Sequence, residues 1–184
     1  MNNTLHPLQQ ISFNHANQAY VVEASAGTGK TWTIERLYIK ALLESSQPYD
    51  ASLPLSVENI LVVTFTNDAT NELKQRIATQ IQTTINTLIV MNKQSLDSKD
   101  DIFLAYLATR TEQFEKDVTL LSRALQNFDQ SAIYTIHGFC KRIIEDYQFE
   151  CKTPSEFELV TNKGRLIENL VVDFMRSEII NNPQ

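Results

Sequence analysis

Eight consecutive residues near the start of the chain have the types and spacing of a phosphate-binding loop. Such loops bind phosphates because small residues leave backbone N–H groups free at the N-terminus of a helix. Two glycines permit the tight path, the lysine reaches the outer phosphates, and the final hydroxyl is a ligand for Mg²⁺. We therefore expect ATP and Mg²⁺ to bind here, with Lys30 and Thr31 as the catalytic pair and Thr31 as the metal ligand. The loop consists of Ala24, Ser25, Ala26, Gly27, Thr28, Gly29, Lys30 and Thr31.

Two later segments carry polar and aromatic residues where a strand is expected to run into a helix. The first is Val63–Asn67, with Phe65, Thr66 and Asn67 at its end. The second is Tyr134–Cys140. Ligands of open α/β sheets bind at the carboxyl ends of strands, and an exposed aromatic residue there can stack on a base. Phe65 can also be a core residue, and His137 can be a capping or packing histidine. Trp32, which follows the phosphate-binding loop, can either pack in the core or lie against the nucleotide base.

Hydrophobic periodicity indicates an α/β chain with a parallel sheet covered by helices on both faces. The order is strand, loop, helix, strand, helix, helical insertion, strand and helix. The expected strands are Tyr20–Val22, Ile60–Phe65 and Ala132–Ile136. The expected helices are Thr31–Leu43, a long helix capped by Asp68, one around Phe139–Tyr147, and Lys163–Ile180. A 4-3-4-3 apolar pattern, which indicates either a core-facing helix or a short coiled-coil seam, is formed by Phe114, Val118, Leu121, Leu125 and Phe128. Ser45–Asn59 is expected to be a loop, and Met91–Asp101 polar and mobile.

Composition sets the broad class. The chain has 184 residues, a net charge of −6 and two cysteines, Cys140 and Cys151, whose spacing fits no common zinc pattern. Neither a signal peptide nor a membrane-spanning run is visible, so we expect a cytoplasmic protein. The negative net charge does not indicate nucleic-acid binding, although a nucleic-acid site needs only local positive charge.

Together, the three segments resemble the first three sequence blocks of superfamily-1 DNA helicases of the UvrD/Rep type. Within that family, the wording of the three blocks is most similar to the RecB branch, the β subunits of bacterial exodeoxyribonuclease V. The blocks read Val-Glu-Ala-Ser-Ala-Gly-Thr-Gly-Lys-Thr, Val-Val-Thr-Phe-Thr-Asn and Thr-Ile-His-Gly-Phe-Cys. AddA-type subunits and simple UvrD-type helicases are the alternatives. A non-catalytic P-loop module that binds a nucleotide or a partner is an alternative of another class.

The resemblance implies contacts with single-stranded DNA by Phe65, Thr66, Asn67, Thr135 and His137. It also implies a RecA-like ATP-binding domain in two parts, 1–90 and 131–150, separated by a helical insertion at 91–130 that is similar to subdomain 1B. A further helical insertion is expected to start within 151–184. The implied function is that of a helicase and exonuclease subunit in double-strand break repair and recombination, acting on duplex ends with RecC- and RecD-like partners.

ATP hydrolysis also needs an acidic pair that binds metal and positions water. In this family an Asp-Glu pair follows a later apolar strand. The only similar stretch is Ile143–Gln148, where Glu145 and Asp146 occur in the reverse order within a helical pattern. We therefore expect a surface helix there, and we expect the chain to be the N-terminal piece of a longer protein, with negligible motor activity of its own.

Overall fold

The computed structural model describes residues 6–13, 19–25, 27–47, 50–93, 101–151 and 163–181. The chain divides into two units, Met1–Cys140 and Lys141–Gln184. The first unit holds the phosphate loop and both strand-to-helix segments.

Helices make up most of the first unit. The helix after the phosphate loop, α2, spans Lys30–Glu44, and α3 spans Asn67–Lys93. In α3 the apolar side chains recur every three or four residues, so they line one face and are buried there: Leu73, Ile77, Ile81, Ile85 and Leu88. The predicted spacing is thus confirmed, but α3 takes in Met91–Lys93 of the stretch expected to be mobile, and 94–100 lie outside the described residues.

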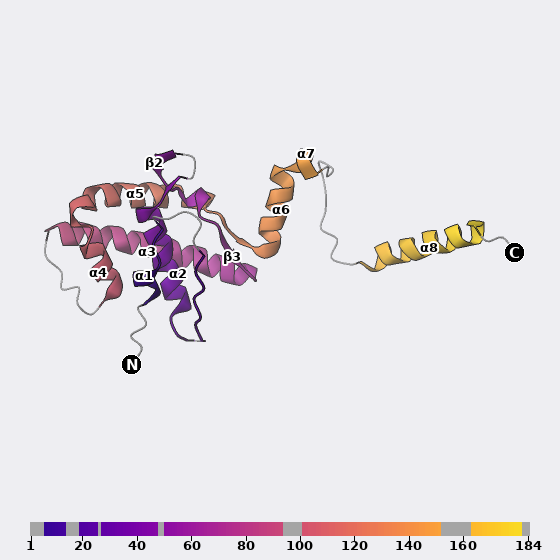
Figure 1. The fold of residues 1–184 in the computed structure, drawn as a ribbon, viewed down its shortest axis with the longest axis horizontal. Coiled ribbons are helices and arrows are strands. Elements are labelled where there is room, and N and C mark those ends of the chain that lie inside the picture. The colour runs from indigo at the N-terminus through magenta and orange to yellow at the C-terminus, as the bar shows by residue number, and fades with distance from the viewer. Residues whose placement is uncertain are drawn as a thin grey trace. The chain divides into compact units, whose positions relative to one another are not determined.

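A further helical segment, residues 102–130, follows. It consists of α4 (Ile102–Ala108), the short turn η2 (Thr111–Gln113), α5 (Phe114–Gln126) and the turn η3 (Phe128–Gln130). Its helix α5 packs on α2 and α3. Figure 1 shows α5 alongside α3. Phe114 and Leu121 are buried in the core, and Val118, Leu125 and Phe128 pack against it. The core-facing interpretation of this pattern is confirmed.

A small parallel sheet links the two strand-to-helix segments. Strand β3 (Val62–Thr64) pairs with β4 (Ile133–Thr135), with Val62 opposite Ile133 and Thr64 opposite Thr135. The expected strands and their parallel direction are confirmed, although both are shorter than predicted. The expectation that β3 is covered on both faces was wrong, because Val63 in its middle is exposed.

Two further expectations for the first unit were wrong. Tyr20–Val22 do not form a buried strand: the structure assigns no strand to this segment, and Val21 is 90% exposed. Ser45–Asn59 is not a simple loop. It contains an antiparallel pair, β1 (Ser46–Gln47) and β2 (Asp50–Pro54), followed by the turn η1 (Val57–Asn59).

The N-terminal segment is held against α2. It contains the four-residue helix α1 (Pro7–Gln10), with Leu8 and Ile11 buried. Lys40 of α2 is buried and its Nζ atom donates to the carbonyl oxygens of Leu8 and Ile11, at 2.7 and 2.6 Å. Since so short a helix is unstable alone, these tertiary bonds keep it in place.

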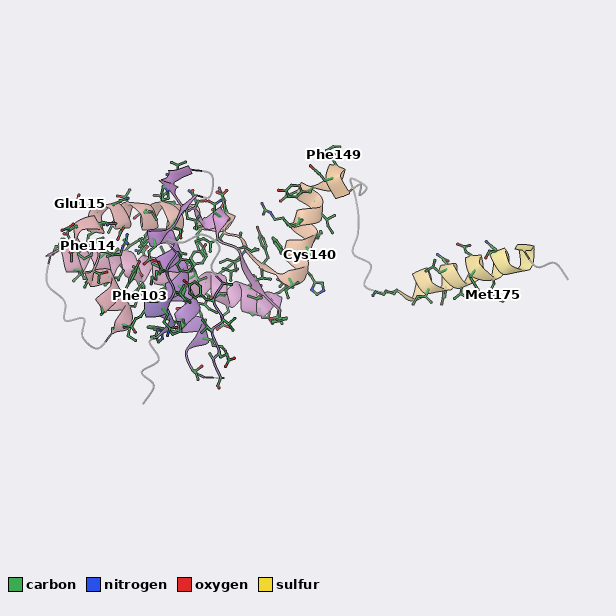
Figure 2. All side chains as sticks on the ribbon, in the orientation of Figure 1. Phe103, Phe114, Glu115, Cys140, Phe149 and Met175 are labelled. Atoms are coloured by element: carbon green, nitrogen blue, oxygen red, sulfur yellow. The ribbon has the colours of Figure 1, made fainter. Side chains whose placement is uncertain are left out.

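The second unit is helical in its described part. Helix α6 (Ile136–Asp146) starts in the first unit and ends in the second, and α7 (Gln148–Cys151) and α8 (Gly164–Asn181) follow. The predicted helices are confirmed. Figure 2 labels Phe149 of α7 and Met175 of α8, both with exposed side chains. No helix in the described part of the chain has the length and apolar character to span a membrane.

The Glu-Asp pair lies on a surface helix, as expected. Glu145 Oε1 lies 3.6 Å from Lys141 Nζ, and Asp146 Oδ2 lies 3.4 Å from Arg142 Nε. Each carboxylate thus forms an ion pair with a cation one helical turn earlier on α6. All four side chains are about half exposed. Each carboxylate therefore serves a solvated pair within its own helix.

Candidate nucleotide and nucleic-acid site

The phosphate loop has the backbone path that its glycines predict. Gly27 and Gly29 have φ angles of +78° and +82°, in the left-handed region that other residues rarely adopt. Gly29 is the N-cap of α2, and no side chain caps this end of the helix. The first N–H groups of α2 therefore point out of the helix without a side-chain acceptor, as an anion site requires. Ala26 lies outside the described residues.

Lys30 and Thr28 close the loop on itself. The Nζ atom of Lys30 donates to the carbonyl oxygens of Ala24 and Ser25, at 2.9 and 3.0 Å. The hydroxyl of Thr28 donates to Ser25 O at 2.7 Å. The ammonium group thus lies at the loop and is exposed, so phosphate oxygens could replace its carbonyl partners.

Thr31 occupies the first turn of α2 and is half-buried. Among the described residues, no group of three or more His, Cys, Asp or Glu side chains could hold a metal ion. The donor set therefore fits a Mg²⁺ ion bound mainly by phosphates and water, with one protein hydroxyl, and does not fit a metal cage built from protein ligands.

A cavity of about 460 Å³ adjoins the loop. Its walls come from the loop (Ala24, Ser25, Thr28 and Lys30), from the preceding segment (Val22 and Glu23), from α2 (Thr33, Ile34 and Leu37) and from the N-terminal segment (His6 and Pro7). His6 is a residue that sequence analysis missed, because no motif marks it. It reaches the cavity only through the fold of the segment before α1.

Trp32 packs within the first unit. The guanidinium carbon of Arg36 lies 3.9 Å from the centre of its ring, and the ring of His6 meets it edge-on at 5.6 Å. The ring also packs against the core cluster and does not line the cavity. Of the two interpretations left open by the sequence, the geometry favours packing. Burial lowers the pKa of Arg36, although Glu35 and Asp101 oppose that shift.

Phe65 projects from the turn between β3 and α3 and is 87% exposed. It is therefore not a core residue. Thr66 follows it and is the N-cap of α3, because its hydroxyl accepts a hydrogen bond from Ala69 N at 3.2 Å. The prediction that Asp68 caps this helix was wrong, since Asp68 lies inside the first turn. Asn67, the first residue of α3, is exposed beside Phe65.

The second strand-to-helix turn has the same cap. Thr135 ends β4, and its hydroxyl accepts from Gly138 N at 3.1 Å, so Thr135 is the N-cap of α6. A Cβ atom at Gly138 would lie 3.1 Å from Thr135 Oγ1, a tight contact that a larger residue could make only if the threonine shifted slightly. His137 is exposed in the first turn of α6. The pairing of Thr64 with Thr135 brings both turns to the same end of the sheet.

Thr70 also belongs to the first turn and was missed by sequence analysis. It is buried, and its hydroxyl contacts both Thr64 Oγ1 and Thr66 O. Its only sequence signal is the four-residue spacing from Thr66, which allows a threonine hydroxyl to bond the carbonyl one helical turn earlier.

The comparisons with known proteins agree with these blocks. Residues 5–182 match the model of the UvrD/REP helicase N-terminal domain. The chain is similar to the RecBCD enzyme subunit RecB of Haemophilus influenzae (43% identity over 87% of this chain) and of Escherichia coli (35% over 85%). It is also similar to that of Chlamydia trachomatis (32% over 87%). It spans only 13 or 14% of the length of these relatives. The chain belongs to the UvrD/REP helicase N-terminal domain family.

Proposed function

We infer that this chain binds ATP–Mg²⁺ at the phosphate loop and single-stranded DNA at the shared end of β3 and β4. It would do so as the N-terminal part of an ATP-dependent DNA helicase and exonuclease subunit. One observation carries the proposal: an uncapped helix N-terminus with two left-handed glycines lies in the same unit as two strand-to-helix turns that present Phe65 and His137 to solvent.

The nucleotide half of the proposal rests on charge and backbone geometry. Free N–H groups of α2 and the ammonium group of Lys30 supply positive charge for the β- and γ-phosphates. Thr31 would hold Mg²⁺, which supplies charge neutralisation at the transferring phosphate. The remaining loop residues, Ala24, Ser25, Ala26, Gly27, Thr28 and Gly29, would wrap the phosphates through their backbone.

The nucleic-acid half rests on the two helix N-termini. Helices α3 and α6 begin at the same end of the sheet, so their N–H groups and partial positive charges are close together. A phosphodiester backbone can be held there, with contacts from Thr66, Asn67 and His137. Phe65 can stack on a base, a contact worth roughly 1–3 kcal/mol. Thr135 would contact the strand as well, because its capping hydroxyl, like that of Thr66, accepts a backbone hydrogen bond and can still donate its own hydrogen.

The wider activity belongs to the longer relatives and is part of the proposal. We propose a RecA-like fold for 1–90 and 131–150, a 1B-like insertion at 91–130, and the start of a further insertion at 151–184. The complete protein would unwind and degrade duplex ends in DNA repair and recombination, in the cytoplasm, with RecC- and RecD-like subunits. The acidic pair for hydrolysis would come from outside this chain, so we expect the 184 residues to bind ATP and hydrolyse it negligibly.

A nucleotide titration tests the first half. We expect a fluorescent ATP analogue with Mg²⁺ to bind the parent chain and the Lys30→Ala variant to bind at least about tenfold more weakly, since a charge-assisted phosphate contact is lost. Lys116→Ala, on the exposed face of α5, is the matched control. Equal binding by the parent and Lys30→Ala would reject the nucleotide site. DNA-stimulated ATPase activity of the parent would reject the assignment of the missing acidic pair.

A strand-binding titration tests the second half. A labelled oligothymidylate should bind the parent chain, and Phe65→Ala and His137→Ala should each weaken that binding. Phe149→Ala is the control, because Phe149 is equally exposed and lies outside both turns. Similar losses for all three variants would indicate non-specific contact with exposed rings and would contradict the proposed strand site.

A further inference from the structure

Two threonine hydroxyls and the backbone carbonyl oxygen of Thr66 lie within hydrogen-bonding distance of one another, as a ring of three oxygen atoms next to Phe65 in the chain. Thr64 precedes Phe65, Thr66 follows it, and Thr70 lies one turn into α3. Thr64 Oγ1 lies 2.5 Å from Thr70 Oγ1. Both hydroxyls also reach Thr66 O, from 3.1 Å for Thr64 and 3.0 Å for Thr70. The two neighbours of Phe65 in the chain, Thr64 and Thr66, therefore belong to one hydrogen-bond network.

Proton counting shows that the ring needs both hydroxyls. Each threonine has one hydroxyl hydrogen. If Thr70 donates to Thr66 O, then Thr64 must donate to Thr70; if Thr70 donates to Thr64, then Thr64 donates to Thr66 O. Either way two hydrogens join three oxygen atoms, and loss of either hydroxyl breaks the direct bond between Thr64 at the strand end and Thr70 in the helix.

The position of the ring makes these bonds effective. The side chain of Thr70 is only 7% exposed, and Thr64 is half-buried. Bonds shielded from water are electrostatically stronger, and a partner left unpaired there costs more than one at the surface. The backbone N–H of Thr70 also donates to Thr66 O at 3.0 Å, so this carbonyl is the point on which the turn is fixed.

Phe65 needs such support because its ring has almost nothing to pack against. A side chain that is 87% exposed is held in place by its backbone and by little else. Preorganisation of a binding residue reduces the entropy lost when the ligand binds. An ordered turn at Thr64–Thr66 would therefore raise affinity without making any contact of its own.

We propose that Thr70 is a positioning residue for nucleic-acid binding: its buried hydroxyl fixes the turn that presents Phe65. This proposal rests on the proposed function, because it assumes that Phe65 meets the strand. It adds a residue that does not touch the ligand. The role also differs from that of the other threonines of α3, such as Thr79, which is exposed and whose hydroxyl donates to the carbonyl of Gln75 within its own helix.

The test compares variants of the 184-residue chain. Thr70→Val keeps the shape and removes the hydroxyl, Thr70→Ser keeps the hydroxyl, and Thr79→Val is the matched control. The readouts are the affinity for a labelled oligothymidylate and the hydrogen exchange of the amides of Phe65, Thr66 and Asn67. We expect Thr70→Val to bind at least about threefold more weakly with faster exchange at these amides, and Thr70→Ser and Thr79→Val to resemble the parent.

Two further variants keep the proposal falsifiable. Thr64→Val opens the same ring from the strand and should reproduce the Thr70→Val result even if Thr70→Val folds poorly. Adding Thr70→Val to Phe65→Ala should cause no additional loss of affinity, because Thr70 acts through Phe65. An additive loss, or a Thr70→Val chain that binds and exchanges like the parent, overturns the positioning role.

The outcomes also separate this proposal from the one beneath it. If Phe65→Ala binds the strand as the parent does, the strand contact itself is wrong and the positioning role falls with it. If Phe65→Ala weakens binding while Thr70→Val and Thr64→Val do not, the strand contact stands and only the positioning role is overturned.

Discussion

Thr66 and Thr135 are the N-caps of two helices that start at the same end of one parallel strand pair. Each hydroxyl accepts from the backbone N–H three residues later. The caps satisfy one N–H group per helix and leave others free. The N–H groups that the caps do not satisfy therefore lie at the same end of the sheet in both helices.

Removal of the second cap should lower stability by a predictable amount. Thr135→Val loses the acceptor for Gly138 N, and we expect the free energy of unfolding to fall by about 1 kcal/mol. Thr135→Ser keeps a hydroxyl and should therefore retain most of the free energy of unfolding that the cap contributes. Denaturant unfolding followed by circular dichroism measures both. The control is Thr119→Val, an exposed threonine of α5 that bonds only Glu115 O. Equal losses at Thr135 and Thr119 would contradict the cap.

The left-handed glycines of the phosphate loop give a ranked prediction. Alanine at Gly29 costs roughly 1–2 kcal/mol in the left-handed region, whereas asparagine tolerates that region better. We expect Gly29→Ala to weaken nucleotide binding more than Gly29→Asn, because the strained loop shifts its N–H groups. At Gly27 a Cβ atom would meet nothing within 4 Å, so alanine there suffers only backbone strain. Titration with a fluorescent nucleotide would show the order, and Gly29→Ala binding as the parent does would contradict it.

The helices could be predicted from the sequence because apolar residues spaced three or four apart lie on one face of a helix, and that face is the one that becomes buried. Leu73, Ile77 and Ile81 fall on one face of α3 whatever packs against them. Strands were harder, since a run such as Tyr20–Val22 reads as a buried strand only if neighbouring strands are present. In the described residues Val21 has no such neighbour and is exposed. The antiparallel pair β1–β2 was not predicted, because the prolines and serines of Ser45–Asn59 favour a loop.

The site was predictable where a residue type has one use and unpredictable where it has several. Gly27, Gly29 and Lys30 form a pattern that few other structures need, and their geometry agrees with it. Threonine can cap, bond to its own helix or contact a ligand. The separate roles of Thr66, Thr70 and Thr135 could therefore be assigned only from distances in the folded chain.

A buried ion pair supports the insertion. Arg110 forms two hydrogen bonds with Asp117, Nε to Oδ2 at 2.7 Å and Nη2 to Oδ1 at 2.8 Å, and also donates to Leu43 O at the end of α2. Hydrogen bonding to Asp117 raises the pKa of Arg110. Because Asp117 is buried, Asp117→Ala should cost about 3 kcal/mol by leaving the guanidinium group without its counter-charge.

Denaturant unfolding tests this pair with two companion variants. Asp129→Ala, an exposed acid in η3, should change the free energy of unfolding by less than about 0.5 kcal/mol. The double variant Arg110→Met with Asp117→Leu should recover much of the loss, since two apolar side chains leave no buried charge unpaired. A double variant as unstable as Asp117→Ala would show that the loss comes from packing and not from charge.

The buried lysine of α2 provides the last prediction, because it joins the N-terminal segment to the helix that starts at the phosphate loop. Lys40 Nζ donates to Leu8 O and Ile11 O, and it lies 3.7 Å from Glu44 Oε1. The other oxygen of Glu44 accepts from Phe13 N at 3.3 Å. Two side chains one helical turn apart thus hold the segment that follows His6, a wall of the cavity beside the loop.

Lys40→Met should release this segment while α2 stays folded. Two carbonyl groups lose their donor, at a cost of about 1–3 kcal/mol each if they remain buried, so local opening is the easier response. We expect hydrogen exchange of the amides at 8–13 to accelerate at least about tenfold, with those of Ile39 and Leu42 unchanged. Lys116→Met on the surface of α5 should leave both regions as in the parent. If exchange instead rises equally along α2, then Lys40 stabilises the whole helical layer and the segment has no separate hold.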